Sequence, residues 1–237
     1  MGKLVERSEA TRRLIDVVVS SVCLVLFSFV FLFIAIATRF GTRGSVLFKQ
    51  KRVGLDEAPF TIYKFRSMPE RCEVFSEERR PAKKEVSRVG RFLRGPGLDE
   101  LPQLVNVLKG EMSLVGPRPL IPEELYCQEE LYYLVRNRCR VRPGLTGLWQ
   151  ITNREKGAVP PFLREMLACD AFYIENRSIW LDLRILFVTI LYVGGCLLKN
   201  MSPSKNGKGH VTLVPSKEMA RIPESQSFTE ARTSKIV

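Results

Sequence analysis

The feature that most constrains this chain is an uninterrupted apolar run near its N-terminus. Residues 17–38 (VVVSSVCLVLFSFVFLFIAIAT) contain no charged side chain over 22 positions. As an α-helix this run is about 33 Å long, which matches the hydrocarbon core of a bilayer. A signal peptide fits poorly, because the run is too long and no small-residue cleavage site follows it. The alternative is a buried core helix, but a chain of 237 residues rarely surrounds a helix that is apolar on all sides.

Basic residues flank this run on both sides: Lys3, Arg7, Arg12 and Arg13 before it, and Arg39, Arg43, Lys49, Lys51 and Arg52 after it. Cytoplasmic flanks of membrane helices carry the excess of Lys and Arg, so both ends are expected on the cytosolic side. That topology requires a helix that enters the membrane, bends and returns. The run has no proline, so the candidates for the bend are Ser28 and the pair Ser20-Ser21, whose hydroxyls can bond carbonyls one turn back.

Residues 44–68 have the pattern of extended structure. A turn-rich stretch at 54–59 separates two short runs, 46–48 and 60–66, which predicts a small β-hairpin. The two-residue period places one set of side chains on the same face of the second run: Phe60, Ile62, Lys64 and Arg66. Residues 69–87 are polar and irregular, typical of a loop.

Two further segments predict helices. In residues 98–110 (LDELPQLVNVLKG) apolar side chains repeat at helical spacing, Asp99 suits the N-cap and Gly110 closes the C-terminal end. Residues 179–198 form a second apolar stretch that Asp182 and Arg184 interrupt. Two charges disfavour a span across the bilayer, so this segment is expected to lie in the membrane interface.

These segments divide the chain into three parts. Residues 1–43 form a basic segment and a membrane helix, 44–198 a cytosolic catalytic domain, and 199–237 a flexible tail rich in polar residues. A helical stretch is expected at 123–140 and a loop at 142–147. The expected fold class is α+β: a membrane-inserted, re-entrant N-terminal helix, then a mainly helical domain with a small β-hairpin and interfacial amphipathic helices.

Composition narrows the chemistry. The chain has 37 basic and 25 acidic residues, a formal charge of +12, which points to an anionic partner such as a phosphate, nucleotide, nucleic acid or acidic lipid. Its single histidine, His210, lies in the polar tail, so His-based triads and multi-His zinc sites are excluded from the folded part. The six cysteines show no paired spacing, which is typical of reduced cytosolic thiols. Carboxylates, Lys, Arg and a metal ion are left to do the chemistry.

The adjacent carboxylates Asp99 and Glu100 are the leading candidate for a site. Acidic residues at a helix start need no function, and this is the alternative. However, Gly95-Pro96-Gly97 just before them lets backbone approach a ligand closely, and a helix start offers free N–H groups to a phosphate. Five cationic residues could converge there: Lys64, Arg88, Arg91, Arg94 and Arg118. Two carboxylates among cations suit Mg²⁺ and phosphoryl transfer through a carboxylate nucleophile.

An ordered set of motifs resembles the monotopic phosphoglycosyl transferases, the bacterial sugar transferase family that begins surface-glycan assembly. The resemblance covers about residues 11–198. Its main motifs are Arg12-Arg13-Leu14-Ile15-Asp16, Phe48-Lys49-Gln50-Lys51-Arg52-Val53-Gly54, Tyr63-Lys64-Phe65-Arg66-Ser67-Met68, Leu98-Asp99-Glu100-Leu101-Pro102-Gln103-Leu104, Gly116-Pro117-Arg118-Pro119 and Arg142-Pro143-Gly144-Leu145-Thr146-Gly147. Each motif alone is weak, but the ordered set is specific.

The resemblance implies transfer of a phosphosugar from a UDP-sugar to polyprenyl (undecaprenyl) phosphate, with release of UMP, at the bacterial inner membrane and on its cytoplasmic side. It also implies a role for each matching residue. Asp99 would be the nucleophile that forms a covalent aspartyl phosphosugar and a ligand of Mg²⁺, and Glu100 its partner carboxylate. Phosphate groups would be bound by Lys64, Arg94 and Arg118, and the nucleotide by Arg142 and Asp170.

Two departures from the family pattern stand out. Family members carry a Ser-Pro pair in the membrane helix, whereas Ser28 is followed here by Phe29, so no proline enforces a kink. Gly95-Pro96-Gly97 replaces the more usual Lys/Arg-Thr-Ser run. The alternative function is a non-catalytic basic membrane adaptor that binds anionic lipid or nucleic acid. It leaves the Asp-Glu pair unexplained, and aromatic side chains do not alternate with the basic runs as in single-strand binders, so no nucleic acid is expected. A homo-oligomer and the identity of the sugar are left open.

Overall fold

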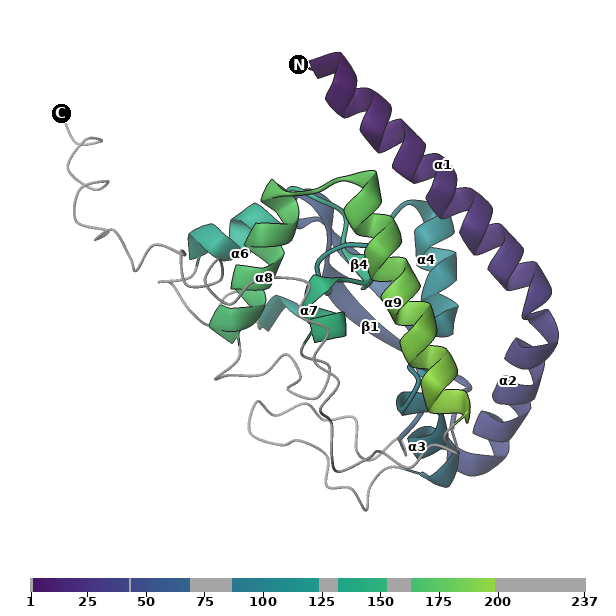
Figure 1. Ribbon diagram of the computed structural model, residues 1–237. Coiled ribbons are helices and arrows are strands. Elements are labelled where there is room, and N and C mark those ends of the chain that lie inside the picture. Colours follow the sequence, from purple (N-terminus) through teal and green to yellow (C-terminus); the bar gives the residue numbers. More distant parts are fainter. Residues whose placement is uncertain (1, 43, 69–86, 124–131, 153–162, 199–237) are drawn as a thin grey trace.

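The structure is a computed structural model that describes residues 2–42, 44–68, 87–123, 132–152 and 163–198. Most of the described chain is helical, with two small sheets at the centre (Figure 1). The helices are α1 Gly2–Leu26, α2 Ser28–Thr42, η1 Leu55–Glu57, α3 Arg88–Arg94, η3 Leu98–Gln103, α4 Leu104–Lys109, α6 Tyr132–Arg138, α7 Leu148–Thr152, α8 Leu163–Glu175 and α9 Ile179–Leu198. The expected 69–87 loop, apart from residue 87, the 199–237 tail, and part of the 123–140 helix lie outside the described residues.

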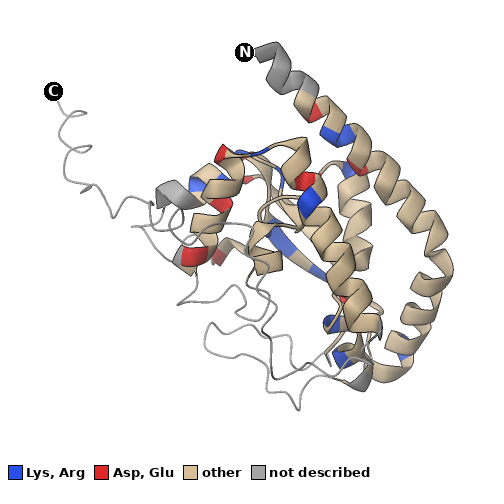
Figure 2. Ribbon diagram, viewed as in Figure 1, with Lys and Arg blue, Asp and Glu red and all other residues tan. Residues whose placement is uncertain are grey.

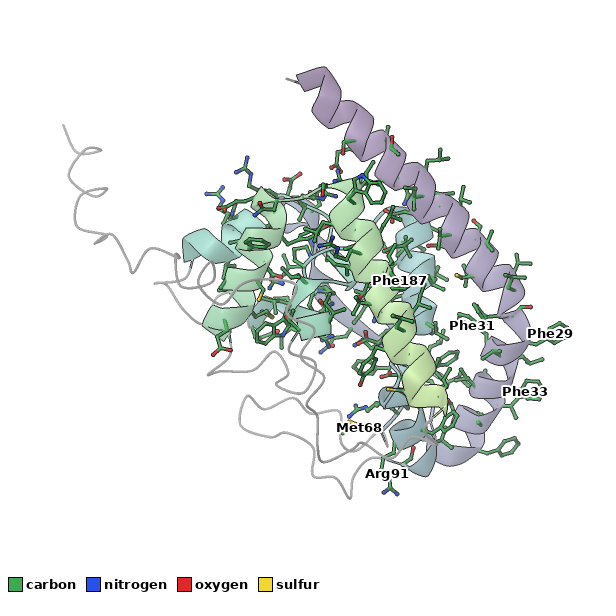
Figure 3. The ribbon with its side chains drawn as sticks, viewed as in Figure 1. Phe29, Phe31, Phe33, Met68, Arg91 and Phe187 are labelled. Carbon is green, nitrogen blue, oxygen red and sulfur yellow. The ribbon has the colours of Figure 1, made fainter. Side chains whose placement is uncertain are left out.

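The apolar run forms two helices with a bend between them. Helices α1 and α2 meet at Phe27 at an angle of 64°, so the bend lies directly before Ser28 and not at Ser20-Ser21. Packing on the inner side holds the bend: the rings of Phe31 and Phe65 lie 5.8 Å apart, and Ile34 is buried beside them. Phe29 and Phe33 point the other way and are 74% and 70% exposed (Figure 3).

Within the described residues, helix α9 is long and apolar enough to cross a membrane, and α1 with α2 passes the same test as a bent pair. Helix α9 has the expected bounds, 179–198, and few of its side chains are buried. Figure 2 shows that charged residues gather on the compact part of the molecule, whereas the ribbon on either side of the α1–α2 bend carries few. An apolar outer surface therefore covers α2, the second half of α1 and most of α9.

The predicted β-hairpin is confirmed. Strands β1 (Leu47–Val53) and β2 (Pro59–Phe65) pair antiparallel, with Leu47 opposite Phe65 and Val53 opposite Pro59. The turn between them includes Asp56 in the left-handed region at φ +51°, which Asp tolerates better than most residues. Alternation buries Ile62 and points Lys64 to the same side of β2.

The predicted single helix at 98–110 is wrong in its first half. Residues Leu98–Gln103 form the 3₁₀ helix η3, and the α-helix α4 begins only at Leu104. Gly97 takes the cap position at φ +80°, so Asp99 lies inside the first turn and is not the N-cap. Gly110 does close α4, at φ +83°, a conformation that glycine adopts without strain.

The structure contains a second sheet that the sequence did not predict, and one of its strands lies in the expected 142–147 loop. The short strands β3 (Ser113–Val115) and β4 (Gly144–Thr146) pair in parallel. The backbones cross so closely that a Cβ on Gly144 would stand 2.1 Å from the Gly116 nitrogen. Glycine is required there because no side chain fits between the two segments.

Polar contacts attach α1 to the rest of the domain. The buried Asp16 carboxylate accepts hydrogen bonds from the Leu114 N–H (2.9 Å) and the Ser113 hydroxyl (3.1 Å) of β3. The Arg13 guanidinium donates to the carbonyls of Val107 and Leu108, which are among the orphan acceptors at the end of α4. The turn of α1 that carries Arg13 and Asp16 is thus packed firmly against the domain core.

Candidate active site

Asp99 and Glu100 lie in the first turn of η3, directly after the left-handed Gly97. The turn is closed by the Glu100 N–H, which donates to the Gly97 carbonyl at 3.1 Å. Asp99 is 9% exposed, while Glu100 is half-buried. The glycine conformation is what turns the chain so that both carboxylates leave the same short helix.

Two cations from other elements converge on Glu100. The Lys64 Nζ, from β2, lies 2.7 Å from the Glu100 carboxylate, and the Arg118 guanidinium, from the loop after β3, lies 3.6 Å from the same oxygen. Arg94, at the end of α3, is held by its Nε, which donates to the Ser67 hydroxyl at 2.7 Å. Burial raises the pKa of the Asp99 carboxyl, and the charge of Arg94 acts against that rise.

Burial and the neighbouring charges act on the pKa values of Asp99 and Lys64. Burial, and then the negative charge of Glu100, raise the pKa of Asp99, while Lys64 and Arg94 act to lower it. Burial lowers the pKa of Lys64, and the Glu100 charge opposes that shift. Ionised Asp99 is therefore poorly solvated. It loses little stabilisation when its oxygen bonds to an electrophile, which favours a role as nucleophile.

Other residues that line the hollow beside Glu100 had no role assigned from the sequence. The hollow is lined by Arg52, Ile62, Lys64, Glu100, Gln103, Arg118, Pro119, Gly144, Leu145 and Gln150. Arg52 and Gln103 lie within motifs that carry the family resemblance, and so does Ser67, which binds Arg94. The sequence therefore marked these residues but did not show that they lie close to the two carboxylates. Gln150 follows the 142–147 motif, and its Oε1 is buried without a hydrogen-bond partner among the described residues.

The other predicted site residues lie in different surroundings. The Arg142 Nε donates to the Gly110 carbonyl at 2.9 Å, at the end of α4. Asp170, on α8, is 2% exposed and ion-paired with Arg138 at 2.9 Å. Arg91 on α3 is exposed (Figure 3), and the side chain of Arg88 is outside the described part. The structure therefore gathers Lys64, Arg94, Asp99, Glu100 and Arg118 and not the whole predicted set.

The donor set for a metal ion is small. Among the described residues there is no group of three or more His, Cys, Asp or Glu side chains that could hold a metal. Mg²⁺, however, is commonly bound by one or two carboxylates, with water and substrate phosphates completing its shell. Asp99 has no cation within ion-pair distance among the described residues, whereas Glu100 is paired, so Asp99 fits such a partial site better.

Comparison with known proteins identifies the family. The family described as bacterial sugar transferase matches residues 7–195. The chain belongs to the bacterial sugar transferase family. This match runs through α1, the hairpin, the Asp99-Glu100 turn and α9, so every element of the candidate site lies within the bacterial sugar transferase region. The comparison does not favour the non-catalytic adaptor.

Several curated bacterial proteins are similar to the chain. A UDP-glucose:undecaprenyl-phosphate glucose-1-phosphate transferase from Klebsiella pneumoniae is 42% identical over 76% of this chain and 39% of its own length. The exopolysaccharide production protein ExoY of Rhizobium meliloti is 41% identical, over 76% of this chain and 83% of its own. A UDP-glucose:undecaprenyl-phosphate glucose-1-phosphate transferase from Caulobacter vibrioides is 40% identical over 76% of this chain and 68% of its own length. The chain thus spans about two fifths of the Klebsiella protein and most of ExoY.

Proposed function

We propose that the chain is a membrane-bound sugar-1-phosphate transferase that moves a phosphosugar from a UDP-sugar to undecaprenyl phosphate in polysaccharide synthesis. The observation that carries the proposal is the buried Asp99 beside Glu100, with Lys64 and Arg118 on the Glu100 carboxylate. Two relatives named as glucose-1-phosphate transferases give the direction of the chemistry. Three cationic side chains around two carboxylates leave a net positive site, which suits a diphosphate substrate.

The transfer takes two displacement steps at phosphorus. In the first, an Asp99 carboxylate oxygen bonds to the phosphorus that bears the sugar, and the bond from that phosphorus to the UMP oxygen breaks, with the electron pair leaving on UMP. In the second, a phosphate oxygen of undecaprenyl phosphate bonds to the same phosphorus and Asp99 leaves as a carboxylate. Each step makes one P–O bond and breaks one, so the covalent aspartyl phosphosugar splits the reaction into two balanced halves.

The neighbouring side chains have separate roles in these steps. Lys64, Arg94 and Arg118 bind the phosphate oxygens and stabilise the charge that develops on them. Glu100 holds Lys64 and Arg118 in place before substrate arrives, and it accepts the proton of a monoprotonated acceptor phosphate. Bound Mg²⁺, with Asp99 among its ligands, would neutralise diphosphate charge.

The membrane arrangement follows from the same proposal. The bent α1–α2 pair enters the cytoplasmic leaflet of the inner membrane and returns, with its basic flanks in the cytosol, and α9 lies in the interface. The exposed Phe29, Phe33 and Phe187 then face acyl chains (Figure 3). This places the catalytic residues on the cytoplasmic side, where UDP-sugars are made available.

The covalent step is tested with a UDP-sugar labelled in the sugar, together with Mg²⁺ and no lipid acceptor. The wild type should release one UMP per active site in a burst and retain the label on the protein, and Asp99→Asn should do neither. Asp56→Asn is the matched control, because it makes the same change at an exposed carboxylate in the hairpin turn. A full burst from Asp99→Asn would remove Asp99 from the nucleophile role, and a panel of UDP-sugars in the same assay identifies the sugar.

The topology is tested with single cysteines in a cysteine-free background. Ala10→Cys and Ser45→Cys lie at exposed positions on either side of the bent pair. A membrane-impermeant maleimide should label neither position in spheroplasts and both after permeabilisation. Labelling of either position in intact spheroplasts would contradict the re-entrant arrangement.

A further inference from the structure

The loop that carries Arg118 is held through its backbone from outside. Four consecutive carbonyls each accept a hydrogen bond from a different donor: Pro117 from the Gly144 N–H (2.8 Å), Arg118 from Arg138 Nη2, Pro119 from Arg52 Nη1 (3.0 Å), and Leu120 from the Val53 N–H (3.0 Å). Pro117 and Pro119 have no N–H and a fixed φ. The loop therefore depends on donors from elsewhere for its position, and two of those donors are buried guanidinium groups.

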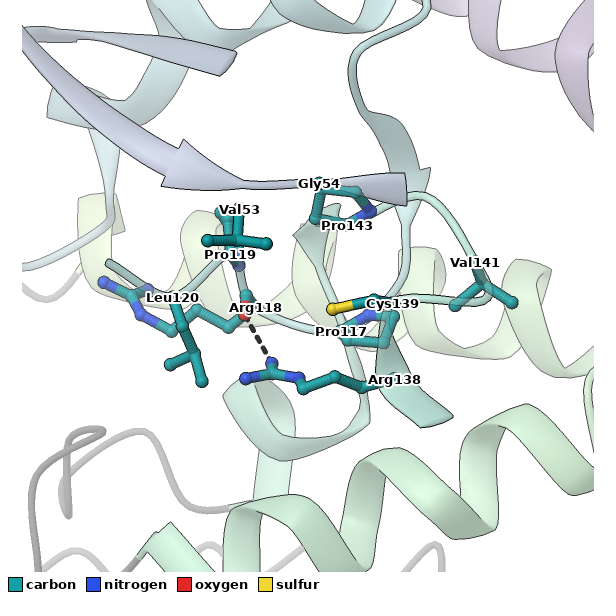
Figure 4. A pocket seen from close by; sticks show the side chains of 10 residues that line it. All are labelled: Val53, Gly54, Pro117, Arg118, Pro119, Leu120, Arg138, Cys139, Val141 and Pro143. Atoms are coloured by element: carbon teal, nitrogen blue, oxygen red, sulfur yellow. Dashed lines mark hydrogen bonds between the residues drawn. The ribbon is translucent and has the colours of Figure 1, made fainter. Parts of the chain in front are cut away.

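The Arg138 guanidinium is in turn held by Asp170. The two side chains are 4% and 3% exposed, and Arg138 Nη2 lies 2.9 Å from an Asp170 oxygen. Figure 4 shows the Arg138 side chain beneath the loop and its bond to the Arg118 carbonyl. The same nitrogen is thus ion-paired with the carboxylate of α8 and donates a hydrogen bond to the backbone of the loop. Both side chains are almost fully buried, so neither can reach a nucleotide bound at the surface.

We propose that Asp170 and Arg138 are positioning residues that fix the backbone under Arg118, and through it the reach of the Arg118 guanidinium toward substrate phosphate. This replaces the nucleotide-binding role that the sequence alone suggested for Asp170. It rests on the proposed function only in naming phosphate as the group that Arg118 binds. The contact itself, from Asp170 through Arg138 to the Arg118 carbonyl, is independent of which sugar is carried.

The physical consequence follows from burial. Without Asp170, Arg138 would keep a buried charge with no counterion, which is strongly unfavourable, so the guanidinium would shift away from this position. The Arg118 carbonyl then loses its donor, and the loop loses one of four restraints. A displacement of the order of 1 Å in a positioning group can lower a reaction rate by about 100-fold. The Arg118 side chain, 32% exposed and 3.6 Å from Glu100, would be displaced with its backbone.

A double-mutant cycle in the single-turnover UMP assay tests this linkage. Asp170→Asn should lower the rate of the first half-reaction by about 10-fold or more, and Arg118→Ala should lower it as well. In the Arg118→Ala background, adding Asp170→Asn should change the rate by less than about twofold, because the group through which Asp170 acts is gone. Equal effects of Asp170→Asn in both backgrounds would overturn the proposal, since a residue that contacts the nucleotide, or one that only supports folding, gives additive losses.

Hydrogen exchange supplies a readout that needs no activity. The amides of Gly144 and Val53, which donate to the loop carbonyls, should exchange faster in Asp170→Asn than in the wild type, and the Asp56→Asn control should match the wild type. Unchanged exchange at both amides would refute the proposal even if activity fell. Should Asp170→Asn fail to fold, Arg138→Lys is the second variant, because it keeps the charge opposite Asp170 but not the planar fork that reaches the carbonyl. If instead Arg118→Ala alone is fully active, the phosphate-binding role of Arg118 fails, while the exchange result still decides whether Asp170 and Arg138 position the loop.

Discussion

The contact between α1 and α9 gives a prediction whose size can be worked from the structure. The Arg12 Nε donates to Asp182 at 2.7 Å, and the Tyr173 hydroxyl donates to the other Asp182 oxygen at 2.7 Å. Arg12 and Asp182 are 8% and 9% exposed. This pair explains why the apolar helix α9 contains Asp182: the carboxylate faces the domain, and Arg12 of α1 neutralises its charge.

Arg12→Met removes one partner of this pair and leaves the Asp182 carboxylate buried with Tyr173 as its remaining donor. Breaking a buried ion pair in this way costs about 3–5 kcal/mol. For a chain of this size, 1 kcal/mol corresponds to a change of about 2–4 °C in Tm, so a fall of roughly 10 °C is expected. The double variant Arg12→Met with Asp182→Leu should recover much of the loss, because an apolar pair of similar volume carries no desolvated charge.

The assay is thermal unfolding in detergent micelles, followed by far-UV circular dichroism. Arg184→Met is the matched control, since it makes the same change at an exposed arginine of α9, the helix that carries Asp182, and it should alter the free energy of unfolding by no more than about 0.5 kcal/mol. A Tm for Arg12→Met within about 2 °C of the wild type would refute the reasoning. So would a double variant less stable than the single one.

Three further outcomes are expected. Glu100→Gln removes the negative charge that raises the pKa of Asp99, so the acid limb of the single-turnover pH profile should move to lower pH; a shift to higher pH would contradict the assignment. Gly144→Ala, whose Cβ would meet backbone at 2.1 Å, should unfold at a much lower temperature than the wild type, while Gly194→Ala, with nothing within 4 Å, should unfold at or above it. Burial raises the pKa of Asp170 from 3.8 to about 6, so the folded state binds this proton more tightly than the unfolded state. The stabilisation from this group is then complete below pH 3.8 and is lost, by roughly 3 kcal/mol, as the pH rises through 6; urea titrations should show that this decline is missing from Asp170→Asn.

Local patterns in the sequence were enough for the hairpin and for α9. The hairpin has alternation on both strands and a turn-rich connection, and α9 has a long apolar stretch with clear ends. The bend in the N-terminal helix was also predictable, but from charge on both flanks and not from any residue that breaks a helix. Its position at Phe27 follows from packing of α2 against β2 and α3, which the sequence does not reveal.

The start of η3 and the second sheet could not be predicted in the same way. Asp99 is a good N-cap residue, but Gly97 can adopt the left-handed conformation and takes that place, which leaves Asp99 inside the turn. Strands β3 and β4 have three residues each, and the two strands lie far apart in the sequence. Segments this short show no recognisable two-residue alternation of apolar and polar side chains. The pair Arg138–Asp170 is likewise visible only once α6 and α8 are packed.

One turn of α1 is connected to both halves of the candidate site. Arg13 bonds the carbonyls at the end of α4, the helix that continues from the turn bearing Asp99, while Asp16 bonds β3, the strand that leads into the Arg118 loop. A shift of α1 along its axis would therefore move the carboxylates and the cationic loop together. For an enzyme whose proposed acceptor is a lipid phosphate, this matters, because that phosphate lies at a nearly fixed height above the acyl chains. In the proposed membrane arrangement, the depth at which the bent pair is seated would set the distance from Asp99 to the acceptor, and the polar contacts of Arg13 and Asp16 would transmit that depth to the site.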